Sequence, residues 1–154
     1  MRTLVFVVAG DRVLLIRYRD RNGAATGEKS DRAGFYNGIG GHVEKGEDIL
    51  DSAAREAMEE AGISLENPRL AGVVHVDGFA GKQIVNFVVT ASTNDTPKAE
   101  CDEGRLEWVE MSRLPDLPVF ADVKPLLERA LTDSPTFTAI ARFDGFELVT
   151  LHLR

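Results

Sequence analysis

Four glutamates that can bind metals or transfer protons lie close to one arginine in the chain: the group is Glu47, Arg55, Glu56, Glu59 and Glu60. Residues three and four apart are neighbours on a helix, so the last three carboxylates crowd along one edge. Like charges this close repel each other unless a cation lies among them, and carboxylate oxygens suit Mg²⁺ or Mn²⁺. The cluster therefore predicts a divalent-metal site, with a solvated acidic helix face as the alternative.

The sequence around this cluster predicts the elements that position it. Asp48 is a residue type that caps helix N-termini, and apolar residues recur at helical spacing through residues 49–61. Gly62 suits the left-handed position that ends a helix. A loop that begins at the pair Gly40-Gly41 precedes this helix, so the acids are expected on a helix that follows a glycine-rich turn.

The rest of the chain predicts a mixed sheet and one more helix. Strands are predicted at the β-prone runs 4–9, 13–18, 35–39, 70–76, 84–91, 106–111, 137–143 and 146–153. Residues 122–131 predict the second helix, with Pro125 in its first turn. The polar segment 19–34 predicts a loop. This order of elements is typical of an α+β fold.

Length and composition restrict the class of protein. A chain of 154 residues predicts a single domain over residues 1–154. The net charge of −7 argues against a nucleic-acid polymer or a membrane as the partner. The single cysteine, Cys101, excludes an internal disulfide. With no segment typical of secretion or of a membrane span, we expect a cytoplasmic protein.

The acidic cluster belongs to a longer pattern that resembles the signature of the Nudix hydrolase superfamily. The matching residues are Gly41, Glu47, Arg55, Glu56, Ala57, Glu59, Glu60, Gly62 and Ile63. Seven fixed identities at about 7% usage each would match by chance at about 10⁻⁶ over this chain. Ala57 is smaller than the usual bulky aliphatic residue. The resemblance implies the Nudix fold, a mixed sheet sandwiched between helices.

Within that superfamily the chain is similar to MutT-type enzymes, which convert nucleoside triphosphates, 8-oxo-dGTP among them, to monophosphates and pyrophosphate. The resemblance implies that Mg²⁺ is held by Glu56, Glu59 and Glu60, with the Gly41 carbonyl and Glu103 as further ligands. Arg55 would orient the cluster by pairing with Glu59 or with Glu47. It also implies Glu56 as the proton acceptor, and Glu103 remains the alternative.

The resemblance further implies a nucleobase pocket, with Asn37, Phe120 and Asp122 as candidate contacts. Turn formation is the alternative role of Asn37, and core packing that of Phe120. His42 replaces a common lysine, so a phosphate contact there would depend on pH. Val123 stands where that branch carries a second acid. A lone exposed Asp122 would be ionised and would only accept hydrogen bonds, so we expect weakened selectivity for oxidised purines.

Other functions remain open at this point. A related enzyme could hydrolyse another nucleoside diphosphate derivative, such as ADP-ribose or a dinucleoside polyphosphate. A Nudix domain could also bind nucleotides without cleaving them, although the intact acids and Arg55 argue against that. The sequence favours a small nucleotide as the partner and leaves the oligomeric state open between a monomer and a homodimer.

Overall fold

The computed structural model describes residues 1–19 and 33–154. The strands are β1 (Arg2–Ala9), β2 (Arg12–Tyr18), β3 (Tyr36–Asn37), β4 (Glu66–Phe79), β5 (Lys82–Ser92), β6 (Gly104–Glu110), β7 (Phe137–Gly145) and β8 (Glu147–Leu153). The helices are α1 (Ile49–Glu56), the π-helical turn η1 (Ala57–Ala61), the 3₁₀ helix η2 (Met111–Asp116) and α2 (Val123–Ala130).

The strands form one mixed sheet with the order β3-β2-β1-β5-β4-β7-β8, and β6 pairs with β2. The pairs β1–β5 and β4–β7 are parallel, whereas every other strand pair is antiparallel. The first parallel pair sets Arg2 opposite Asn86. Two residues far apart in the sequence thereby meet at the start of β1.

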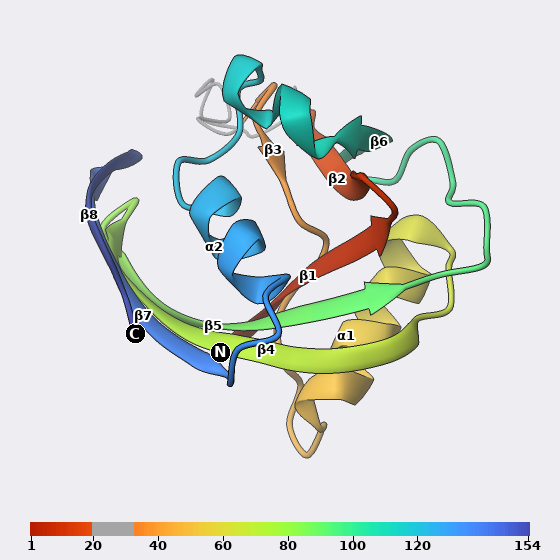
Figure 1. Ribbon diagram of the computed structural model, residues 1–154, viewed down its shortest axis with the longest axis horizontal. Coiled ribbons are helices and arrows are strands. Elements are labelled where there is room, and N and C mark those ends of the chain that lie inside the picture. Colours follow the sequence, from red (N-terminus) through yellow and green to blue (C-terminus); the bar gives the residue numbers. More distant parts are fainter. Residues whose placement is uncertain (20–32) are drawn as a thin grey trace, which may run out of the picture.

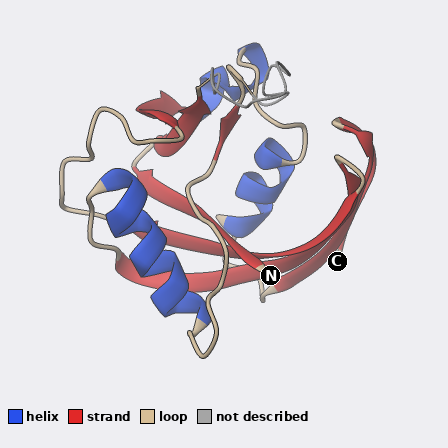
Figure 2. Ribbon diagram, turned by 180° about the vertical axis from the view of Figure 1, so that it is seen from behind, coloured by secondary structure: helices blue, strands red, loops and turns tan. Residues whose placement is uncertain are grey.

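The helices cover opposite faces of this sheet, as Figure 1 and the reverse view in Figure 2 show. The α2 side chains Leu126 and Leu127 pack with Phe6 and Phe137 in one core. On the other face, small alanines of α1 and η1 pack against Val5, Val7 and Val89 in a second core. Because alanine is short, the acidic helix lies close to the sheet that carries the rest of the site.

The acidic helix has the predicted ends and an unpredicted wide turn. Asp48 caps it, accepting a hydrogen bond from the Leu50 amide at 2.9 Å. Gly62 ends it in the left-handed conformation, at φ 67°. Residues 57–61 form a π-helical turn, a feature found often at functional sites. That turn carries Glu59 and Glu60.

The predicted strands and second helix are confirmed, with differences in their bounds. The segment 35–39 forms a strand only at residues 36–37. It then bends along β1, where the Val5 amide donates a hydrogen bond to the Ile39 carbonyl. β4 continues to Phe79 through an irregularity at Asp77. β6 ends at Glu110. The predicted loop 19–34 lies mostly outside the described residues.

No helix among the residues described here is both long and apolar enough to span a membrane.

The Asp48 cap generates the first prediction. Asp48→Ala should lower the free energy of unfolding by about 1 kcal/mol, because the Leu50 amide loses its acceptor. Asp48→Asn should keep most of the stability, since asparagine caps helices about as well. Urea titration of the two variants measures the difference. Equal losses in both variants would show that the charge, and not the hydrogen bond, matters.

Candidate active site

The acids of α1 and η1 face the loop that precedes β6 across an open hollow. Its lining includes Glu56, Glu59 and Glu60 from the helix and Glu103 from the loop. Sequence reasoning singled out these four residues, and the structure brings them to one place. Lys98 is the basic residue at this hollow, and its ammonium donates to the Glu59 carbonyl at 3.3 Å.

Arg55 ties the acids to the preceding loop. Its guanidinium donates two hydrogen bonds to Glu47, at 2.8 and 3.0 Å. It also donates to Glu56 at 3.0 Å and to Glu59 at 3.2 Å. A further bond, at 2.9 Å, reaches the His42 carbonyl. Both pairings considered from the sequence therefore form together.

The fork of Arg55 explains the ionisation of Glu47. Hydrogen bonds from Arg55 lower the pKa of Glu47 to about 2, and the Glu44 amide adds a further donor. Arg55 in turn has a raised pKa, mainly because of Glu47. Both groups are therefore charged across the physiological pH range, and the loop stays fixed to the helix.

Glu60 lies deeper than the other acids and contacts the glycine turn. Its carboxylate accepts from the Gly40 amide at 3.0 Å. Burial, helped by the negative charges of Glu103 and Glu56, raises the pKa of Glu60 to about 7, although the hydrogen bond from Gly40 lowers it. A carboxylate in such surroundings becomes fully ionised more readily when a cation lies beside it.

The glycine pair leaves room for these acids. A side chain on Gly41 would collide with the Glu56 carboxylate, and one on Gly40 with the Thr3 carbonyl. Gly40 also adopts φ 136°, which side-chain-bearing residues rarely occupy. The Gly41 carbonyl, a predicted metal ligand, accepts a hydrogen bond from the Thr3 amide at 2.8 Å.

The donor set suits a divalent cation in its chemistry. It consists of carboxylate oxygens held on a helix, with a raised pKa at Glu60. Within residues 1–19 and 33–154, no group of three or more acids, histidines or cysteines is arranged closely enough to hold a metal ion. Arg55 and the Gly40 amide engage the carboxylates instead.

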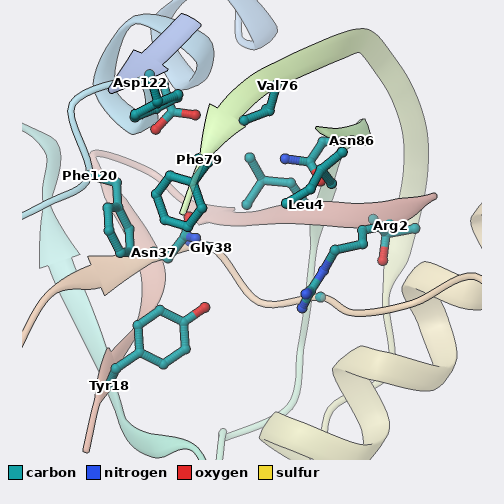
Figure 3. A pocket seen from close by; sticks show the side chains of 14 residues that line it. Arg2, Leu4, Tyr18, Asn37, Gly38, Val76, Phe79, Asn86, Phe120 and Asp122 are labelled. Atoms are coloured by element: carbon teal, nitrogen blue, oxygen red, sulfur yellow. The ribbon is translucent and has the colours of Figure 1, made fainter. Parts of the chain in front are cut away.

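A second cavity opens on the other side of Gly40 and has about 610 Å³ of space, its mouth included. The three predicted base contacts Asn37, Phe120 and Asp122 all line it (Figure 3). Their common location is a finding, and their contact with a base stays a prediction. Asn37 also has the alternative role considered for it, since its side chain accepts from the Gly38 amide at 2.9 Å.

Aromatic rings form one wall of this pocket. Phe120 is buried and stacks on Phe35 with ring centres 5.1 Å apart. Phe79 packs edge-to-face with Phe120, with ring centres 5.4 Å apart, and with Phe143, with ring centres 5.1 Å apart. Phe120 is thus both a core residue and a pocket residue. Flat apolar walls of this kind suit a planar ring.

The expectation that Asp122 is exposed and fully ionised is wrong. The residue is only 8% exposed, and burial raises the pKa of its carboxyl to about 6. Val123 is buried beside it in the core and supplies no second acid. Asp122 therefore exists in both protonation states just below neutral pH, and it can donate a hydrogen bond as well as accept one.

The structure also places His42, for which a phosphate contact was predicted, and two pocket residues that had not been predicted. His42 does not line the pocket; it lines a neighbouring hollow with Met1 and Lys82, and Arg2 lines both. Its contact with a phosphate stays a prediction. Sequence reasoning missed Arg2 and Asn86, which line the pocket. No local pattern marks them, since the parallel pairing of β1 with β5 brings them there.

Comparison with known proteins identifies the family. The NUDIX domain profile matches residues 1–130. The chain belongs to the Nudix family. The predicted α+β sandwich and the expected Nudix hydrolase class are thereby confirmed, and the signature around Arg55 lies within the matched region.

Relatives of this Nudix chain include two curated enzymes. The oxidized purine nucleoside triphosphate hydrolase of Danio rerio is 28% identical over 151 residues, covering 97% of this chain and 90% of the relative. The Mus musculus enzyme of the same description is 31% identical, covering 80% and 71%. A MutT protein from Bacillus halodurans has a similar structure, with a TM-score of 0.80 and 28% identity, covering 99% and 95%.

The buried Asp122 predicts an unusual dependence of stability on pH. Its pKa is higher in the folded protein, at about 6, than the ordinary value of 3.8. The folded state therefore binds more protons between these values, so stability falls as the pH rises from about 4 to above 6. The Nudix domain should lose on the order of 3 kcal/mol through this group.

Urea titration from pH 4 to pH 8 measures this effect against Asp122→Asn, which has no titrating carboxyl. The difference in unfolding free energy between the variant and the wild type should grow in favour of the variant as the pH rises. Asp116→Asn, at an exposed position, serves as the matched control. A constant difference between Asp122→Asn and the wild type over this range would contradict the burial argument.

Proposed function

We propose that this Nudix protein hydrolyses purine (deoxy)nucleoside triphosphates, oxidised purines such as 8-oxo-dGTP among them, to monophosphate and pyrophosphate. The observation that carries the proposal is the connection of two sites through Gly40. This residue lines the pocket of Asn37 and Asp122, and its amide binds Glu60 of the acidic hollow. A base in the pocket would direct its phosphates toward the acids.

We assign the cation to Glu56, Glu59 and Glu60, with Glu103 and the Gly41 carbonyl as further ligands. Mg²⁺, or Mn²⁺ in its place, neutralises phosphate charge and lowers the pKa of bound water when it is present. Glu56 is the proposed proton acceptor, because its carboxylate lies directly over Gly41 and is oriented by Arg55. Arg55 and Glu47 position the acids and do not need to touch the substrate.

The polar groups of the pocket support the proposal that it binds a purine base. Asn37 and Asp122 lie at the same end of the pocket as the Phe120 ring. The side chain of Asn86 enters the pocket from β5 (Figure 3). An oxidised purine carries an N7 proton and a C8 carbonyl, so it needs one acceptor and one donor. Asp122 can supply either group, and the Asn86 amide supplies a neutral donor. The curated relatives described as oxidized purine nucleoside triphosphate hydrolases support the same choice.

The metal assignment predicts that Glu59→Gln and Glu60→Gln lose at least two orders of magnitude in kcat while remaining folded. Each decade corresponds to 1.36 kcal/mol of barrier. Turnover is followed as pyrophosphate released from dGTP, with added Mg²⁺ and then with excess EDTA. Glu66→Gln, an exposed acid on β4, should behave as the wild type. Full turnover in EDTA would exclude the metal assignment.

The pocket assignment predicts a preference for purines. We expect kcat/KM for 8-oxo-dGTP, dGTP and dATP to exceed that for dCTP by roughly tenfold or more, the ratio that about 1.4 kcal/mol of differential binding gives. Asn37→Ala and Asp122→Ala should reduce these ratios more than they slow dCTP. Asn94→Ala, an exposed position outside the pocket, is the control. A clear preference for dCTP would overturn the assignment.

A further inference from the structure

Arg2 lies at the junction of the two sites. It stands at the start of β1 and lines the pocket together with Gly38 and Gly40. Figure 3 shows its guanidinium on the far side of the pocket from Phe120 and Asp122, toward the acidic helix. Its positive charge also lowers the pKa of Glu60, which places it within electrostatic reach of the acids.

The guanidinium of Arg2 has no protein partner in the part of the chain that the structure describes. The ion pairs there involve Arg19, Arg55 and Lys124. No side-chain hydrogen bond of Arg2 occurs among the described residues. Arg2 is partly buried, and its guanidinium presents five donors in a fixed plane, so these donors are available to a ligand in the pocket. Such a fork matches the oxygens of a phosphate.

The order of groups along the cavity indicates which phosphate it meets. A base between the aromatic wall and Asp122 occupies one end, and the acids that would hold a cation lie beyond Gly40 at the other. In a nucleoside triphosphate the sugar and the phosphate attached to it lie between the base and the outer phosphates. Arg2 lies at this intermediate position.

We propose that Arg2 binds the sugar-linked phosphate of the nucleotide and so aligns the base pocket with the acidic hollow. This inference rests on the proposed function, because it takes the pocket as a nucleotide site. It adds a binding residue that lies outside the acidic signature. The alternative is that Arg2 serves only to moderate the charge of Glu60.

The test compares two ligands that differ by that phosphate alone, deoxyguanosine and dGMP, by calorimetry in EDTA. In Arg2→Met the affinity for dGMP relative to deoxyguanosine should fall roughly tenfold, while deoxyguanosine binding changes less than about twofold. Arg2→Lys should retain part of the dGMP preference, because the charge remains and the planar fork is lost. Arg12→Met, at an exposed arginine over Trp108, should match the wild type.

An unchanged ratio of the dGMP affinity to the deoxyguanosine affinity in Arg2→Met would overturn the proposal. An equal loss of affinity for both ligands would overturn it as well. A role restricted to Glu60 would shift the pH profile of kcat and leave the ratio intact. Arg2→Met should also have a higher KM for dGTP than the wild type, and this change should be larger than the decrease in kcat. If the wild type releases no pyrophosphate yet Arg2→Met loses the dGMP preference, the proposed reaction is wrong and the Arg2 assignment stands.

Discussion

The repulsion among the clustered carboxylates governs the architecture of the site, and Arg55 is the group that balances it. Its guanidinium reaches Glu47, Glu56 and Glu59 at 2.8 to 3.2 Å. Through these bonds a loop and a helix become one rigid unit. The alanines beneath that unit seat it against β1 and β5, so the position of the acids follows from the sheet.

The glycine turn connects this unit to the pocket. Its backbone is bonded to β1, because the Thr3 amide donates a hydrogen bond to the Gly41 carbonyl at 2.8 Å. Gly40 then serves two regions, because it lines the pocket while its amide binds Glu60. A displacement of β1 would therefore move both sites together. The base and the phosphates of one ligand would keep a fixed separation between their binding groups.

Sequence reasoning succeeded where the information is local. The Asp48 cap, the Gly62 end and the two closing strands predicted at 137–143 and 146–153 depend on neighbours within a few residues, and the structure contains them all. It failed where burial or long-range pairing decides. Asp122 has a raised pKa because the surrounding fold covers it. Likewise Arg2 meets Asn86 only because β1 pairs with β5, which no local pattern announces.

The closing hairpin β7–β8 supplies part of the pocket wall, although it lies outside the matched range of the chain. It begins at Phe137, beyond the residues 1–130 that the family profile matches. Yet Phe143 lines the pocket, and Phe146 packs against Phe79 with ring centres 5.1 Å apart. Exchanging this hairpin between relatives would change one wall of the pocket and leave the acidic hollow unchanged. Under the proposed function, the choice of substrate would then be separated from the chemistry performed on it.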